Sequence, residues 1–241
     1  MSPAENHGGD ANVTVRTRQE LAAVIDHTLL NPSAVAADIR RHCCEAVEHR
    51  FAAVCVNPRW MSLAADIVRG SAVKVAGVVG FGFGAETTTI KAAQARDVVF
   101  NGADEVDMLA DLAAIREGDR NYFVREMRAV LTVCRSVRPP VVLKVIIESA
   151  ALTDEQIIFA CRAAQDVGVD FIKTSTGLHP AGGARVEHVR LMAATAPRCR
   201  IKAAGGIRTA ADAIAMLEAG ASRIGASASV EILRTFSPPG T

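Results

Sequence analysis

Short apolar runs alternate with longer amphipathic stretches along most of the chain. The runs are rich in Val and Ile, and Ala-rich segments of helical character separate them. Near-continuously apolar strands are typical of a parallel sheet that helices cover on both faces. The predicted strands are residues 24–29, 53–56, 73–80, 105–110, 141–147, 170–174, 200–204 and 223–225.

The predicted helices carry recognisable end signals. Thr153 and Gln156 have the spacing of a capping box, in which each side chain bonds the other's backbone N–H group. Gly102, Gly168 and Gly220 each follow a helical pattern, where a left-handed residue ends a helix. Each glycine is followed within two residues by Asp or Ser and then by a predicted strand. Helices and strands are therefore expected to alternate.

Like positions recur at a fixed spacing. Lys144, Lys173 and Lys202 are equally spaced along the chain, and the same interval separates Asp26 from Cys55. Eight equal units of a 241-residue chain would contain about 30 residues each, which matches that interval and the length of one βα unit. We therefore predict an α/β protein with a single (β/α)8 TIM barrel over residues 14–236, and mobile tails at 1–13 and 237–241. An open doubly wound sheet is the alternative.

Composition narrows the class of protein. Lys plus Arg number 27 and Asp plus Glu 26, which gives a net charge of +1, and there is no basic run. This balance predicts neither a nucleic-acid partner nor an anionic membrane surface. The segment 1–20 lacks the apolar region of a secretory signal. Six cysteines without a C-x-x-C pair indicate reduced thiols, so we expect a cytoplasmic protein.

Three lysines inside apolar strands suggest the chemistry. Burial and a neighbouring cation both lower the pKa of an amine, so Lys144, Lys173 and Lys202 are expected to meet at one barrel mouth, with one of them neutral. A neutral amine attacks a carbonyl to form an imine, which stabilises an adjacent carbanion. This is the chemistry of a metal-free aldolase. Asp107 is placed to relay protons, and Asp26 to hold Lys144 in the same network.

Glycine-rich loops follow the last three predicted strands, at residues 176–183, 205–206 and 225–227. Loops after strands seven and eight commonly bind phosphate in barrels of this class, because glycine lets backbone N–H groups approach an anion closely. Each loop alone could be an ordinary turn. Their succession beside two strand lysines favours a phosphate site.

Two other features are weaker signals. Residues 80–85 fit a dinucleotide-binding pattern, and Asp104 and Glu105 follow about 20 residues later. Those acids stand at the start of the next strand, whereas a ribose-binding acid stands at the far end, so we do not predict a dinucleotide. Cys55 occupies either a pocket position or that of a small buried apolar residue.

The motifs IDHTLL, VCVNP, GADEVDML, LKVIIE, DFIKTSTG, IKAAGGIRT and RIGAS occur in this order from about Leu21 to Leu233. In this the chain resembles the deoxyribose-phosphate aldolase family. The resemblance implies a class I aldolase on a (β/α)8 barrel. It would reversibly cleave 2-deoxy-D-ribose 5-phosphate to D-glyceraldehyde 3-phosphate and acetaldehyde, with no metal or other cofactor. An apolar helix face could pack against a second copy, so the sequence allows a homo-oligomer.

The resemblance also assigns roles. Lys173 would form the Schiff base, Lys202 would perturb it and shuttle protons, and Asp107 would donate and accept protons, while Lys144 and Asp26 would support them. The positions expected to contact substrate are Thr28, Cys55, Thr176, Gly177, Gly205, Gly206, Gly225 and Ser227.

The chain departs from the family pattern in places that bear on phosphate binding. Residues 178–185 form a loop one residue longer than in relatives, without their threonine, and Ser227 is followed by Ala228 rather than by a second serine. Two alternatives follow from these departures. One is a Schiff-base lyase for another sugar phosphate. The other is a non-catalytic barrel that binds a phosphometabolite, which would have no use for two strand lysines and Asp107.

Overall fold

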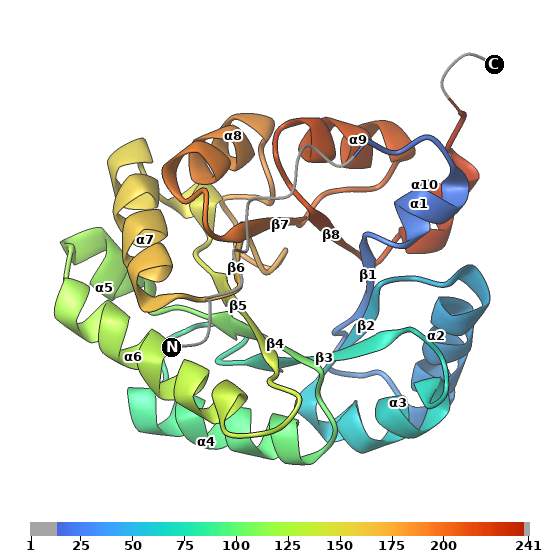
Figure 1. Ribbon diagram of the computed structural model, residues 1–241, viewed down its shortest axis with the longest axis horizontal. Coiled ribbons are helices and arrows are strands. Elements are labelled where there is room, and N and C mark those ends of the chain that lie inside the picture. The colour runs from blue at the N-terminus through green and yellow to red at the C-terminus, as the bar shows by residue number, and fades with distance from the viewer. Residues whose placement is uncertain (1–13, 239–241) are drawn as a thin grey trace, which may run out of the picture.

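Within residues 14–238, which the computed structural model describes, eight parallel strands close into one barrel (Figure 1). The strands are β1 (Ile25–Leu29), β2 (Ala53–Val56), β3 (Lys74–Val79), β4 (Glu105–Leu109), β5 (Val142–Ile146), β6 (Phe171–Lys173), β7 (Arg200–Ala204) and β8 (Arg223–Ala226). The α-helices are α1 (Arg18–Ala22), α2 (Ala36–His49), α3 (Met61–Val68), α4 (Thr88–Phe100), α5 (Leu112–Glu117), α6 (Arg120–Arg135), α7 (Asp154–Val167), α8 (Val186–Thr195), α9 (Ala210–Glu218) and α10 (Ser229–Arg234).

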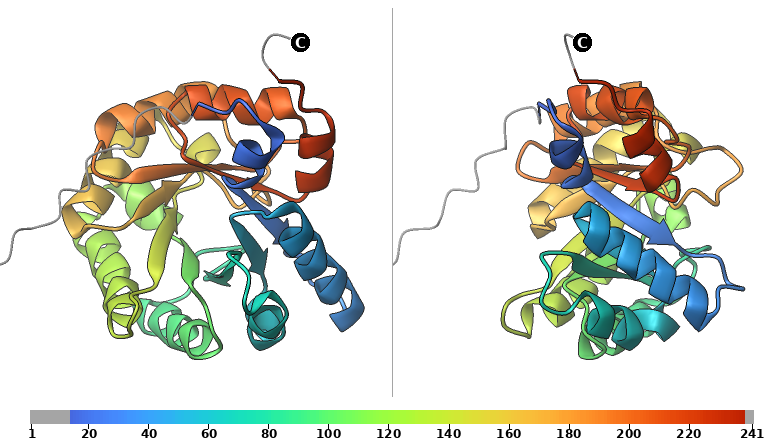
Figure 2. Two further views of the ribbon diagram at one scale, coloured as in Figure 1. Left: turned by 45° about the vertical axis from the view of Figure 1, so that its right-hand side comes forward. Right: turned by 90° about the vertical axis from the view of Figure 1, so that its right-hand side faces the viewer.

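The strands follow one another round the barrel in chain order, and β8 pairs with β1. This closure confirms the predicted (β/α)8 barrel and excludes the open sheet. The observed ends of β2 and β7 are the predicted ones, and the other strands differ by one residue at one or both ends. The helices lie around the outside, as two further views show (Figure 2).

The predicted helix ends are confirmed. The Thr153 N–H group donates to Gln156 Oε1 at 3.0 Å, and the Gln156 N–H group donates to Thr153 Oγ1 at 3.4 Å, as a capping box requires. Gly102, Gly168 and Gly220 have φ values of 99°, 82° and 108°. This left-handed region strains any residue with a side chain, so glycine ends these helices at low cost.

The two faces of the strands bury different kinds of residue. On β4, Val106 and Met108 belong to the apolar core between the sheet and the helices. Glu105 and Asp107 alternate with them and meet polar side chains from other strands inside the barrel. The barrel interior is therefore unusually polar, and its charges must be paired.

The predicted N-terminal tail, residues 1–13, lies outside the described residues, as do residues 239–241 of the predicted C-terminal tail. Ser237 and Pro238, the first two residues of that tail, are exposed. None of the helices between residues 14 and 238 combines the length and apolarity needed to cross a membrane.

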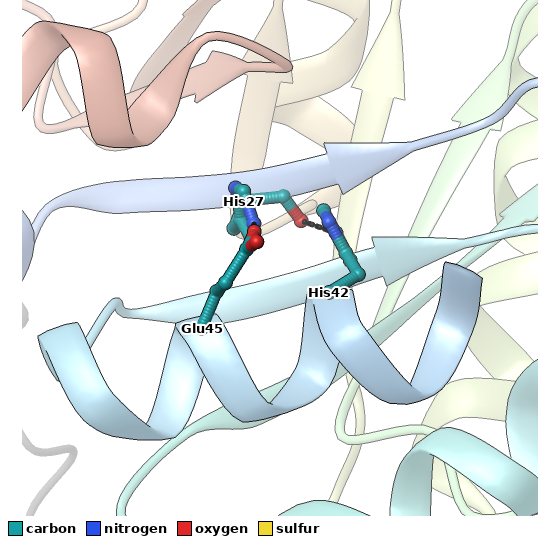
Figure 3. Close-up of side chains that lie close together, drawn as sticks. All are labelled: His27, His42 and Glu45. Carbon is teal, nitrogen blue, oxygen red and sulfur yellow. Dashed lines mark hydrogen bonds and ion pairs between the residues drawn. The ribbon is translucent and has the colours of Figure 1, made fainter. Parts of the chain in front are cut away.

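An outward-facing histidine of β1 packs on α2 (Figure 3). The His27 and His42 rings are stacked, with centroids 3.7 Å apart and planes 18° from parallel. His42 Nε2 lies 3.0 Å from the backbone oxygen of His27, and Glu45 Oε2 lies 3.1 Å from His27 Nε2. Metal-binding lone pairs lie in the ring planes, and nearly parallel planes do not converge on one ion. We therefore interpret this cluster as a packing contact, one that the sequence did not predict.

The histidine pair predicts acid sensitivity of the fold. Burial lowers the pKa of His27 to about 4, and burial together with the neighbouring His27 lowers that of His42 to about 3. Both pKa values are near 6.5 in the unfolded chain, so the unfolded state binds more protons between about pH 6.5 and pH 4. The free energy of unfolding should therefore fall as the pH falls through this window, by up to about 1.4 kcal/mol per pH unit for each histidine.

Urea unfolding at a series of pH values checks this expectation. His42→Gln keeps a donor for the His27 backbone oxygen and removes one titrating group, so its slope in this window should be about half that of the parent. Equal slopes in the two proteins would assign the acid sensitivity to other groups.

Candidate active site

A cavity of about 400 Å³ opens at the carboxyl ends of the strands. Strands β1, β6, β7 and β8 and the loops after them contribute most of its lining, and this is the end of the barrel where (β/α)8 enzymes place their active sites. The lining includes eight of the residues predicted from the sequence: Thr28, Lys173, Thr176, Gly177, Gly205, Gly206, Gly225 and Ser227. Of the predicted substrate contacts, Cys55 alone lies outside this lining, because it is fully buried and packs against Ala76 and Val78.

Asp107 lies at the centre of the three strand lysines. Its Oδ1 accepts a hydrogen bond from Lys144 Nζ at 2.8 Å. Its Oδ2 accepts from Lys173 Nζ at 2.8 Å and from Lys202 Nζ at 2.7 Å. Lys202 also donates to Asp26 Oδ2 at 2.5 Å, and Lys144 lies 3.6 Å from the same oxygen. The structure therefore brings together all five residues that were predicted to form the polar network.

Only one of the three lysines belongs to the cavity lining. Lys173 does, whereas Lys144 and Lys202 are fully buried and do not. The three amines nevertheless meet at Asp107, as expected. The strand register explains the depth of Lys144: it is level with Phe171, two residues before Lys173. Lys202 is level with Lys173, but Asp26 and Asp107 hold its ammonium group inside the barrel.

The lysines differ in how many carboxylates they contact. Lys173 has one such partner, Asp107. Burial lowers the pKa of Lys173 below its usual value, because the attraction of Asp107 is opposed by the like charge of Lys202. Burial also acts on Lys202, but its two carboxylate partners outweigh burial and raise the pKa. Lys173 is therefore the amine that is most easily kept neutral.

The remaining lysine is held in its charged form. Lys144 contacts Asp107 and Glu105, the latter at 2.5 Å between Nζ and Oε2. Burial is the largest influence on Lys144, yet the neighbouring carboxylates outweigh it and raise the pKa. The same cations hold the pKa of Asp107 well below its usual value in spite of complete burial, so Asp107 stays ionised.

Comparison with known proteins agrees with this geometry. The sequence model of the DeoC/LacD family aldolases matches residues 21–234. The chain belongs to the DeoC/LacD aldolase family. It is 49% identical to the deoxyribose-phosphate aldolase of Kocuria rhizophila over 218 residues, which are 90% of this chain and 97% of that protein. It is 48% identical to the deoxyribose-phosphate aldolase of Aciduliprofundum boonei over 219 residues, again 90% and 97% of the two chains.

Solved structures point to the same family. The tetrameric deoxyribose phosphate aldolase from Aeropyrum pernix superimposes with a TM-score of 0.85 at 30% identity, over 92% of this chain and 93% of that one. Aldolases of the DeoC family belong to class I, which forms a Schiff base with a lysine.

Two charged residues of this DeoC/LacD aldolase were not predicted as part of the site. Arg223 donates from Nε to Asp26 Oδ1 at 2.8 Å, and its Nη1 and Nη2 donate to the Glu105 carboxylate at 3.2 and 3.1 Å. Both residues could have been found by strand alternation. Glu105 stands two positions before Asp107, and Arg223 two positions before Gly225, which places each pair on one face of its strand.

Three further residues of the cavity lining were not predicted from the sequence: Phe81, Arg208 and Asn31. The Phe81 ring lies over Lys173, with its centroid 5.8 Å from Nζ. Arg208 is an exposed cation two residues after Gly206, and it lines the cavity together with Asn31. The position of Arg208 two residues after the glycine pair of a predicted phosphate loop was the available signal.

Glycines shape the site by what they leave out. A side chain at Gly225 would come within 2.9 Å of Ala204 Cβ and 3.0 Å of Lys202 Cε, so glycine makes room for the buried lysine. A side chain at Gly183 would come within 2.2 Å of the backbone oxygen of Gly205, so the loop after β6 packs directly on the loop after β7. The Thr176 N–H group donates to Glu148 Oε1 at 2.7 Å, which leaves it unavailable to a bound anion.

Proposed function

We propose that this chain is a class I aldolase that reversibly cleaves 2-deoxy-D-ribose 5-phosphate to D-glyceraldehyde 3-phosphate and acetaldehyde, as the names of its relatives suggest. The observation that carries the proposal is Lys173: a buried amine of lowered pKa that lines the cavity, with its Nζ hydrogen-bonded to Asp107. Such an amine is a nucleophile near neutral pH.

The proposed reaction starts from the open-chain aldehyde. Lys173 Nζ attacks C1, and loss of water from the carbinolamine gives a protonated imine, which withdraws electrons from the C2–C3 bond. A base removes the proton from the C3 hydroxyl, the C2–C3 bond breaks, and glyceraldehyde 3-phosphate leaves. The electron pair of that bond remains as an enamine, which takes up a proton at C2. Hydrolysis of the imine then releases acetaldehyde and restores Lys173.

Asp107 and Lys202 are the proposed proton carriers. Asp107 Oδ2 accepts hydrogen bonds from both Lys173 and Lys202, so one oxygen joins the reacting nitrogen to a second acid–base group. Lys144 and Asp26 are proposed to hold these groups in place, since they contact Asp107 and Lys202 but do not line the cavity. The iminium ion serves as the electron sink, so the proposed route uses neither a metal nor another cofactor.

The phosphate is proposed to bind at the other side of the same cavity. Gly205, Gly206 and Ser227 lie on the loops after β7 and β8, where barrels commonly place phosphate, and Arg208 adds a positive charge to the lining. The remaining proposed substrate contacts in the lining are Thr28, Thr176, Gly177 and Gly225. We further propose that residues 14–236 form the catalytic domain and that the enzyme acts in the cytoplasm. We also propose that it forms a homo-oligomer, because the Aeropyrum pernix relative is a tetramer.

Borohydride trapping tests the proposal. Incubation with acetaldehyde and borohydride should leave an ethyl group on Lys173, which mass spectrometry of peptides can locate. In a separate coupled assay, the enzyme should cleave deoxyribose 5-phosphate. Omission of the aldehyde is the control. An adduct on another lysine, or no adduct and no turnover, would refute the proposal. A higher kcat/KM for a different aldehyde phosphate would favour the alternative that the altered loop at residues 178–185 raises.

A further inference from the structure

The charged network extends below the groups that the proposed reaction uses. Among residues 14–238, it contains four cations, Lys144, Lys173, Lys202 and Arg223, and three carboxylates, Asp26, Glu105 and Asp107. Every one of these side chains is at most 14% exposed. Solvent therefore screens the network weakly, and its charges must be balanced internally.

The count leaves one cation in excess. With all seven groups ionised the network would carry a net charge of +1, and with one amine neutral it carries none. Of the four cations, Lys173 makes the fewest carboxylate contacts and is the one that lines the cavity, so releasing its proton sacrifices the least attraction. The neutral state of Lys173 is thus a property of the whole network and not of Lys202 alone.

Arg223 supplies the charge that creates this excess. Its guanidinium group bonds Asp26 through Nε and Nη2 and spans both oxygens of Glu105. With Arg223 present, the groups around Lys173 sum to zero. Without it they would sum to −1, and this surplus negative charge would favour a protonated Lys173.

We propose that Arg223, which is outside the cavity lining, is a positioning residue that keeps Lys173 neutral by occupying Asp26 and Glu105. The inference rests on the proposed role of Lys173 as the nucleophile. An arginine suits this task because it stays protonated in proteins and its planar guanidinium group can bond two carboxylates at once.

Within the described part of the chain, Lys202 on β7 is level with Arg223 and shares Asp26 with it, and Lys144 on β5 shares both of its carboxylates. Asp26 on β1 and Glu105 on β4 bind Arg223, and the ring of Phe171 on β6 lies 5.9 Å from its Cζ atom. Arg200 on β7 stacks on the same ring at 4.0 Å, but it is exposed and therefore screened by water. Around Lys173 the facing groups are Asp107, Lys202 and the Cys55 thiol, whose own pKa is raised by burial.

Four variants test the inference, which predicts whether each of them raises, lowers or preserves the pKa of Lys173. Arg223→Met removes a positive charge and should raise the pKa of Lys173 by about one unit. Glu105→Gln removes a negative charge and should lower the pKa by a similar amount. The double variant restores the balance and should return the pKa to near the parent value. Arg223→Lys keeps the charge and should leave the pKa near that of the parent, even where the lost bidentate contact lowers stability.

Two measurements are made on each variant. Competitive acylation at a series of pH values, read by mass spectrometry of the Lys173 peptide, gives the pKa of this amine without reference to turnover. The pH profile of kcat/KM gives the same pKa from its acidic limb, which should move upward for Arg223→Met and downward for Glu105→Gln.

The outcomes separate this inference from the proposed function. Opposite shifts in the two single variants, cancelled in the double variant, support the inference, because a merely structural role for Arg223 would not reverse sign. An unshifted acylation profile in both Arg223→Met and Glu105→Gln overturns it, as does a shift of the same sign in both. A parent protein that acylates normally at Lys173 but does not turn over deoxyribose 5-phosphate contradicts the proposed function instead.

Discussion

Lys173→Met is expected to lower kcat/KM by a factor on the order of 10⁴ or more and to abolish the borohydride adduct. The reason is that, within residues 14–238, Lys173 provides the amine of the cavity lining, so the variant cannot form the covalent intermediate. Methionine fills a similar volume. It leaves Asp107 bonded to Lys144 and Lys202, so the charges that remain are already balanced. Folding stability should change little by comparison.

Steady-state assays and peptide mass spectrometry after trapping check this result, with thermal unfolding as the check on the fold. Lys202→Met is the matched comparison, since it removes a neighbouring lysine from the same network but leaves the Lys173 amine in place. It should reduce turnover and still give a trapped adduct. A borohydride adduct that persisted in Lys173→Met would show that another amine is the nucleophile.

The barrel and the identity of its inward-facing lysines were predictable because both follow from periodicity. The equal spacing of Lys144, Lys173 and Lys202 repeats the same position in successive βα units, and alternation along a strand then keeps the side chains on one face. The depth of each lysine was not predictable in this way. Depth depends on how strands are staggered, and the stagger places Lys144 opposite Phe171 rather than opposite Lys173.

Contacts between distant segments were the other limit. Arg223 and Glu105 are 118 residues apart in the chain. They stand in the motifs RIGAS and GADEVDML, but neither motif indicates that the two side chains meet. Only barrel closure brings them together inside the lumen. The stacked pair of His27 and His42 likewise depends on how α2 packs against β1, which no local pattern of residues specifies.

The glycines of residues 80–85 show how a motif can have a purely structural cause. Gly80, Gly82 and Gly84 have positive φ values of 60°, 107° and 69°. A side chain at Gly84 would lie 2.3 Å from the backbone oxygen of Ala110. These glycines allow a tight loop after β3 to pack against the end of β4, and they bring Phe81 to the cavity. Their spacing thus follows from barrel packing.

Asp107→Asn is expected to lower kcat by roughly 10³-fold, within the range by which proton transfer from a positioned group accelerates reactions. The amide can still contact the lysines, but it cannot carry a proton between Lys173 and Lys202. Removal of the shared negative charge also lowers the pKa of Lys173 further, so the amine remains a nucleophile. Slow trapping with borohydride should therefore survive the loss of turnover.

Exchange of acetaldehyde methyl protons in D2O isolates the step concerned, because exchange requires the enamine to gain and lose a proton at C2. We expect Asp107→Asn to slow this exchange about as much as it slows turnover. We also expect it to lower the free energy of unfolding by about 3–5 kcal/mol, since the buried ammonium groups of Lys144 and Lys202 lose a charged partner. Glu105→Gln is the matched control, because it removes a carboxylate from the same network that does not contact Lys173. At pH values above the acidic limb of the pH–rate profile, this variant should catalyse exchange of the methyl protons at close to the parent rate. If Asp107→Asn catalysed exchange at the parent rate, Lys202 or water in the cavity would carry the proton. Asp107 would then have an electrostatic role alone.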